Sequence, residues 1–168
     1  MNPSARRGVA KAALWRCPKC GGRFTTRNQW HSCGSFDMDA LFARSEPLVR
    51  RLFNRFLEVV KESGAVTIIP QKTRIALLVR MRFAALMPQK SVLKGHLVLA
   101  QRCPSARFDK IETYSPRNHV HVFRLRSEDA FDTHFCELIG EAYKVGRREH
   151  LDSRPYKKHG ADGAARRR

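Results

Sequence analysis

The sequence predicts an α+β fold, in which an antiparallel β-sheet carries two helices on one face. A small zinc-knuckle module precedes this domain, and disordered basic tails flank it. Apolar residues follow a helical period, then form several short strand-like runs, then follow a helical period again. The links between the strand-like runs are too short for helical crossovers, which favours antiparallel pairing. One face of such a sheet can stay open, and we expect a binding site there.

The 168 residues divide into four segments. We expect a disordered basic arm over residues 1–13, a zinc-binding module over 14–36, an α+β domain over 37–146 and a disordered basic tail over 147–168. Hydrophobic residues make up 42% of the chain, which suffices for one compact core. No apolar run approaches the roughly 20 residues of a membrane-spanning helix, and no secretory signal is recognisable. We therefore expect a cytoplasmic protein without membrane contact.

The first helical pattern follows a short helical lead-in over residues 37–44. Ser45 is the expected N-cap of the longer helix, Glu46 and Pro47 fall in its first turn, and Gly64 fits just beyond its end. Its apolar stripe consists of Leu48, Val49, Leu52, Phe53, Phe56, Val59 and Val60. A stripe of this width must cover another element, which we expect to be the sheet.

The strands of that sheet are expected at 66–69, 74–79, 82–86, 92–100 and 119–125. Residues 101–118 are rich in polar residues and proline, and they are expected to form a long loop. Ser127 is the expected N-cap of a final helix. The core stripe of that helix consists of Phe131, Phe135, Leu138, Ile139 and Ala142.

Three cysteines and one histidine near the start of the chain predict a structural zinc site. Cys17 and Cys20 form a C-P-x-C-G turn, in which Gly21 permits a left-handed backbone. His31 and Cys33 are two residues apart, so they point the same way from an extended segment and not from a helix. Four protein ligands leave no open position for a substrate, so the one Zn²⁺ ion is expected to be structural. Trp15, Phe24 and Trp30 would cover this small module.

Two other interpretations of the cysteines are weaker. Four unrelated polar residues in a loop would not show this close spacing, and a redox C-x-x-C motif lacks the βαβ surroundings that such motifs have. The five cysteines are too unevenly placed for a disulfide scaffold, which agrees with a reducing compartment.

The charge of the chain predicts a polyanionic partner such as DNA or RNA. Thirty-three basic and fifteen acidic residues give a net charge of +18. The two ends carry ten of these charges, but the body is basic as well. The alternative explanation is solubility together with a coding bias towards arginine.

Six basic residues lie on or between the expected strands: Lys72, Arg74, Arg80, Arg82, Lys90 and Lys94. If several of them share the open face of the sheet, they form a polyanion-binding surface. Phe83 and Tyr114 would add base stacking, as on sheets that bind single strands. The alternative is that the lysines guard strand edges against aggregation and that Phe83 belongs to the core.

A second possible ligand cluster consists of His96, His119 and His121. His119 and His121 share one face of a strand, and His96 comes from another strand, so they could hold a metal or supply a general base. Phe123 and Leu125 share the parity of His119 and His121, which favours a buried face instead. No phosphate-binding loop, nucleophile elbow or zinc-protease motif is present, and no catalytic residue is assigned.

Four stretches of the chain resemble a known bacterial family. They are Trp-Arg-Cys-Pro-Lys-Cys at 15–20, Asn-Gln-Trp-His-Ser-Cys-Gly at 28–34, Phe83 with Pro-Gln-Lys at 88–90, and Glu-Ala-Tyr at 141–143. The chain resembles the domain of unknown function 5655 in the form preceded by a small Cys/His zinc-ribbon-like segment, over about residues 14–146. The resemblance implies a compact α+β domain in a bacterial cytoplasm, and it implies no established activity.

The leading hypothesis is therefore a zinc-containing module that associates with nucleic acid or another polyanion. One alternative is a domain that binds or converts a small ligand with Lys72, Lys90, His96, His119 and His121. Another is an adaptor that binds proteins.

Overall fold

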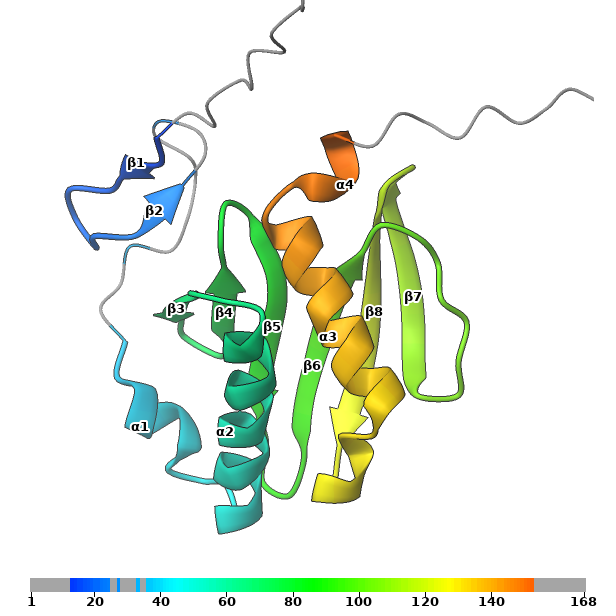
Figure 1. Cartoon of the computed structure of the whole chain (residues 1–168). Coiled ribbons are helices and arrows are strands. Elements are labelled where there is room, and N and C mark those ends of the chain that lie inside the picture. Colours follow the sequence, from blue (N-terminus) through cyan, green and yellow to red (C-terminus); the bar gives the residue numbers. More distant parts are fainter. Residues whose placement is uncertain (1–12, 25–26, 28–32, 34–35, 153–168) are drawn as a thin grey trace, which may run out of the picture.

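The computed structural model describes residues 13–24, 27, 33 and 36–152 (Figure 1). The predicted basic arm and most of the predicted basic tail lie outside these residues, so their expected disorder stays a prediction. None of the helices in the described part is both long and apolar enough to cross a membrane.

Six antiparallel strands form the central sheet, so the predicted antiparallel arrangement is confirmed, although the sequence predicted only five of the strands. They are β3 (Thr67–Pro70), β4 (Ile75–Leu78), β5 (Arg82–Pro88), β6 (Leu93–Leu99), β7 (Phe108–Ser115) and β8 (Asn118–Leu125). The order across the sheet is β3-β4-β5-β6-β8-β7, so β3 and β7 are the two edges. Every neighbouring pair runs antiparallel.

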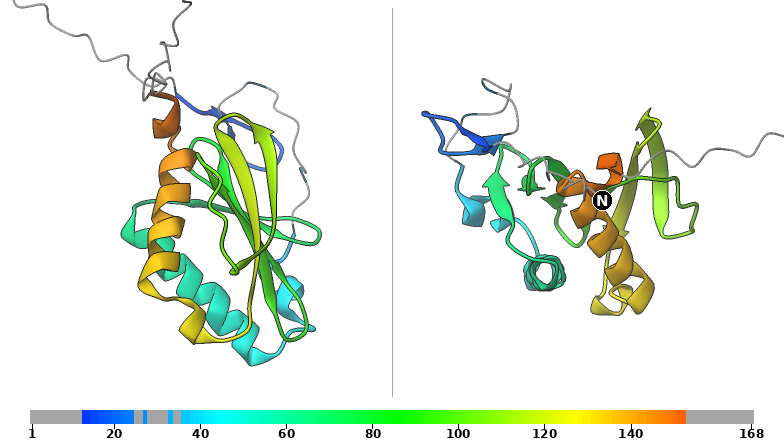
Figure 2. Two further views of the ribbon diagram at one scale, coloured as in Figure 1. Left: turned by 90° about the vertical axis from the view of Figure 1, so that its right-hand side faces the viewer. Right: turned by 45° about the horizontal axis from the view of Figure 1, so that its top comes forward.

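The helices are α1 (Met38–Phe42), α2 (Pro47–Glu62), α3 (Thr133–Gly146) and α4 (Glu149–Asp152), with a 3-10 turn at Glu128–Ala130. Both long helices, α2 and α3, lie on the same face of the sheet (Figure 2). The main core fills the space between them and the sheet, where Phe56 of α2 stacks on Phe123 of β8 with ring centroids 6.0 Å apart. Within the described residues, the opposite face carries no long helix, as expected.

Both long helices begin one or more residues later than predicted. The N-cap of α2 is Glu46 and not Ser45, because Pro47 has no N–H to be capped and suits the first helical position. The N-cap of α3 is Asp132 and not Ser127. Its carboxylate accepts a hydrogen bond of 2.8 Å from the Phe135 N–H.

The predicted loop over 101–118 was wrong in its second half, because β7 occupies residues 108–115 and pairs with β8. Phe108 and Ile111 of β7 pack towards the core. The other residues of β7 are mostly polar, and Lys110 and Glu112 lie on the open face, which hid the strand in the sequence. An edge strand with one solvated face needs few apolar residues.

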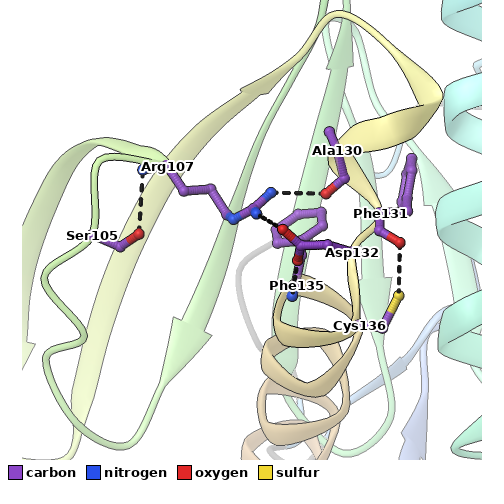
Figure 3. Close-up of polar contacts among 7 residues, drawn as sticks. All are labelled: Ser105, Arg107, Ala130, Phe131, Asp132, Phe135 and Cys136. Atoms are coloured by element: carbon purple, nitrogen blue, oxygen red, sulfur yellow. Dashed lines mark hydrogen bonds and ion pairs between the residues drawn. The ribbon is translucent and has the colours of Figure 1, made fainter.

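Arg107 anchors the connection into β7 to the start of α3 (Figure 3). Its guanidinium donates to the Ala130 carbonyl at 2.8 Å and to the Asp132 carboxylate, and it lies 4.9 Å from the centre of the Phe135 ring. The Arg107 side chain therefore ties the start of the edge strand β7 to the N-cap of α3.

The predicted disordered tail starts too early, because α4 lies within it. The Arg117 side chain, next to the β7–β8 turn, donates to the carbonyls of His150 and Leu151 at 3.2 and 3.3 Å. These bonds satisfy carbonyl groups that the end of a short helix leaves free.

Candidate metal centre and basic groove

Three cysteine thiols meet in the N-terminal module. The strands β1 (Trp15–Arg16) and β2 (Arg23–Phe24) pair in antiparallel fashion, and Cys17 directly follows β1. The turn between the strands is closed by two backbone hydrogen bonds, from Cys17 N–H to the Gly22 carbonyl at 2.8 Å and from Gly21 N–H to the Cys17 carbonyl at 2.9 Å. Gly21 adopts a φ of 71°, the left-handed conformation that its position in the motif predicted.

The three sulfurs are spaced as ligands of one ion. The Sγ atoms of Cys17, Cys20 and Cys33 all lie within 4.8 Å of one another, and those of Cys17 and Cys33 are 3.6 Å apart. Two sulfurs bound to one tetrahedral zinc ion lie about 3.8 Å apart, because each Zn–S bond is about 2.3 Å long. The three cysteines can therefore hold a metal ion. The predicted fourth ligand, His31, lies outside the described residues.

The closeness of the three thiols disfavours their negatively charged thiolate forms. Desolvation and, to a lesser extent, the neighbouring Cys17 and Cys20 together raise the pKa of Cys33 to about 11. Thiolates this close repel one another unless a cation lies between them.

The module packs on the open face of the sheet at the β3–β4 side. Cys17 and Phe24 are buried together with Ala76 and Leu78 of β4, and Ile69 of β3 packs against this cluster. Trp15 also contacts the cluster, and its ring centroid is 6.1 Å from that of Phe24. The module therefore covers part of the face that the long helices leave open, and the remainder stays accessible.

The uncovered part of the open sheet face is hollowed and basic. In the register of the sheet, Lys94 lies opposite Met87 of β5 and opposite Arg124 of β8, and Arg74 extends this row one residue before β4. A cavity of about 380 Å³ lies over β5, β6, β8 and β7. We call this cavity, with the arginines at its side, the basic groove. Its cations are Arg74, Arg82, Lys94, Lys110 and Arg124.

His96 lies in the floor of the basic groove, between Ala85 and Val122 on the neighbouring strands. Burial, together with the positive charges of Arg74 and Arg82, lowers the pKa of His96 to about 4. Glu112 opposes this effect but does not cancel it. At neutral pH the imidazole is therefore uncharged, and the positive charge of the groove comes from lysine and arginine.

Two carboxylates in the groove are already paired. Lys110 forms an ion pair with Glu112, and Arg124 lies 3.4 Å from the carboxylate of Asp109. Among the residues that the structure describes, no carboxylate forms an ion pair with Arg74, Arg82 or Lys94. Their charge is available to an anionic ligand.

The predicted polyanion-binding set is thus only partly brought together. Arg74, Arg82 and Lys94 gather around His96, whereas Lys72 lies in the exposed turn between β3 and β4 and Lys90 in the turn between β5 and β6. Arg80 lies in the turn between β4 and β5, where its N–H donates to the Gly146 carbonyl at 3.0 Å.

The predicted histidine cluster does not form. His121 pairs with Leu97 and His119 with Leu99 in the register, so both point to the helix side of the sheet, opposite to His96. His121 is fully buried, and its Nε2 accepts a hydrogen bond of 2.9 Å from the Cys103 N–H. His121 thus supports the loop before β7, whereas His119 Nδ1 lies 3.0 Å from Thr113 Oγ1 within β7. The alternative site that joined these histidines to His96, Lys72 and Lys90 is therefore not assembled.

Sequence reasoning also misplaced or missed some groove residues. Phe83, a proposed stacking residue, is fully buried against Tyr143 with ring centroids 5.6 Å apart. Lys110 and Arg124 were missed. For Lys110 the strand itself was not expected, because Phe108 and Ile111 stand three apart and the register shifts between Phe108 and Lys110. Tyr114, the other proposed stacking residue, is 72% exposed.

Comparisons with known proteins bear on the main domain. The family model described as "Domain of unknown function (DUF5655)" matches residues 38–146, from the first residue of α1 to the last residue of α3. Neither the curated proteins nor the solved structures gave a match. The match covers more than half of the chain and the whole six-stranded sheet with both long helices, and the chain therefore belongs to the DUF5655 family.

Proposed function

We propose that this protein is a zinc-containing module that binds polyanions in the basic groove. The observation that carries the proposal is the gathering of Arg74, Arg82 and Lys94 on one open sheet face without carboxylate partners among the described residues. A cation cluster that an acidic side chain does not neutralise attracts phosphate or carboxylate groups from solution.

The metal part of the proposal rests on the donor set. Thiolates favour Zn²⁺ among the metal ions common in proteins, and the spacing of Cys17, Cys20 and Cys33 suits tetrahedral coordination. We propose His31 as the fourth ligand. A closed set of four protein ligands makes the ion structural, and it would hold the module against β3 and β4.

Metal content tests this part directly. The purified wild-type chain is expected to carry about one zinc ion, and Cys20→Ser is expected to lose it during dialysis against a weak chelator. Cys136→Ser is the matched control, because Cys136 lies in α3, remote from the cluster, and this variant should keep its zinc. One zinc ion per chain retained in Cys20→Ser would remove Cys20 from the ligand set.

Polyanion binding is tested by salt dependence in the full chain. Replacing Arg74, Arg82 and Lys94 by glutamine is expected to weaken binding of heparin and of a DNA oligonucleotide, and to flatten the plot of log affinity against log salt by roughly 0.7 for each lost contact with a single strand. Lys61→Gln, an exposed change on the helix side, is the control. An unchanged affinity and slope in the triple variant would assign the binding to other parts of the chain and contradict the proposal.

The groove size also allows a small anion, such as a phosphorylated metabolite. That alternative predicts that inorganic phosphate or a nucleotide at low millimolar concentration displaces heparin from the wild-type chain. A multivalent polymer contact predicts that displacement needs high ionic strength instead.

A further inference from the structure

Tyr114 is an exposed aromatic ring at the end of the basic groove. With 72% of its surface accessible, it is the most exposed large apolar side chain that the structure describes. It lies on the edge strand β7, and its hydroxyl donates to Glu112 Oε2 at 3.2 Å. The hydrogen bond fixes the ring while its faces stay in solvent.

The ring is connected to the groove by its neighbours on β7. Lys110, Glu112 and Tyr114 alternate along the strand, and Lys110 and Glu112 both line the groove. Glu112 binds Lys110 and Tyr114 at once, so a cation and an aromatic ring are held side by side. A phosphate at Lys110 would place the attached nucleotide within reach of the ring.

The basic groove also continues into a second cavity. Asp109 and Arg124 border a second cavity, of about 590 Å³, that leads past Arg126 and His134 to the start of α3. Across the sheet, the row from Arg74 to Arg124 spans three strand spacings, or about 14 Å. A track of cations that continues from one hollow into the next suits an extended chain better than a compact metabolite.

From the ring, the cation beside it and the continuous track, we propose that the polymer bound in the basic groove is single-stranded nucleic acid, with one base stacked on Tyr114. The proposal rests on the polyanion-binding function proposed above and narrows its ligand. In a duplex the faces of the bases are covered by their neighbours, whereas a single strand offers its phosphates to the arginines and a free base to the ring. Stacking of this kind tolerates any sequence, because every base has a π-face.

The test compares three probes on the full, zinc-loaded chain by fluorescence anisotropy at fixed salt. They are a 12-nucleotide single-stranded DNA of mixed sequence, the duplex of the same sequence, and a 12-mer of abasic sites that keeps the phosphates without the bases. Tyr114→Ala is expected to weaken binding of the single strand about tenfold, and to leave binding of the duplex and the abasic strand unchanged. Tyr114→Phe keeps the ring and should retain most of the affinity for the single strand.

Two results would overturn the stacking proposal: a Tyr114→Ala variant that binds the single strand like wild type, or one that loses affinity for the abasic strand by the same factor. Either result is compatible with the proposed polyanion binding, provided that the variant with Arg74, Arg82 and Lys94 replaced by glutamine still loses affinity for all three probes. If the triple variant binds all three like wild type, the proposed function itself fails. Since Tyr114 is exposed, a thermal melt of each variant should match wild type and exclude unfolding as the cause.

Discussion

Gly95 lies in β6 directly against core side chains. A Cβ atom there would lie 2.6 Å from Cζ of Phe123 and 2.8 Å from Cδ2 of Leu86. Phe123 is held by the rings around it, so neither neighbour can give way cheaply. We expect Gly95→Ala to lower the free energy of unfolding by about 1–3 kcal/mol through overpacking.

Gly140 of α3 provides the matched control. A Cβ atom there would meet only Ser63 Oγ, at 3.8 Å, and alanine has the higher helix propensity. Gly140→Ala should therefore raise the free energy of unfolding, by up to about 1 kcal/mol. Urea denaturation of both variants measures the contrast, and a Gly95→Ala variant as stable as wild type would show that the sheet is packed less tightly at β6 than the structure indicates.

His96 predicts a pH dependence of stability. The unfolded chain binds a proton at this residue below a pKa of about 6.5, whereas the folded chain, with its pKa lowered to about 4, does so only in more acid solution. Between these values the unfolded state holds more protons, so the contribution of His96 to stability falls as the pH drops from 6.5 to 4 and is constant below that. The full shift corresponds to about 3 kcal/mol.

His96→Gln should remove this part of the pH dependence. Burial also lowers the pKa of His121, so wild type and variant must be compared over the same range, and the difference between their unfolding curves belongs to His96. Parallel curves from pH 6.5 to 4 would show that the imidazole is accessible to solvent and that Arg74 and Arg82 are not close to it.

At the scale of elements, Arg107 links the edge strand to α3. Arg107→Ala removes two hydrogen bonds and the contact with Phe135, and it takes a partner from the N-cap Asp132. We expect a loss of about 1–3 kcal/mol in the free energy of unfolding and faster amide exchange in β7. Arg126→Ala, a change at an exposed neighbouring arginine, should change neither. Unaltered exchange in β7 of the Arg107 variant would contradict the anchoring role.

The elements that the sequence predicted well are those whose apolar residues alone define them. The stripe of α2 has a clear helical period, and the buried run of β4 has no other reasonable assignment. β7 was missed because its open side is polar and its apolar residues, Phe108, Ile111 and Tyr114, stand three apart, so the stretch resembled a loop. The cap of α3 was misplaced because Ser127 and Asp132 are both good capping residues, and the choice between them depends on Arg107, which is distant in sequence.

At the scale of the whole molecule, net charge predicted a polyanionic partner but not a place for it. The proposed place follows from the strand order, which puts Arg74, Lys94 and Arg124 from three parts of the chain into one row. Local spacing was enough for the cysteine cluster, since its three residues are near in sequence. The predicted histidine cluster does not form because its residues come from strands distant in sequence. The alternation along β8 shows that His119 and His121 share a face, but it cannot show that His96 of β6 lies on the other face.

Localisation of the bound polymer tests the central claim most directly. Full-length, isotope-labelled protein is titrated with the single-stranded 12-mer, and the amide chemical shifts are followed by NMR. If the polymer binds in the basic groove, the largest shifts occur in β6, β7 and β8 around His96, Lys110 and Tyr114, with little change in α2. Shifts confined to the N- and C-terminal segments, with the strands unaffected, would contradict binding in the groove.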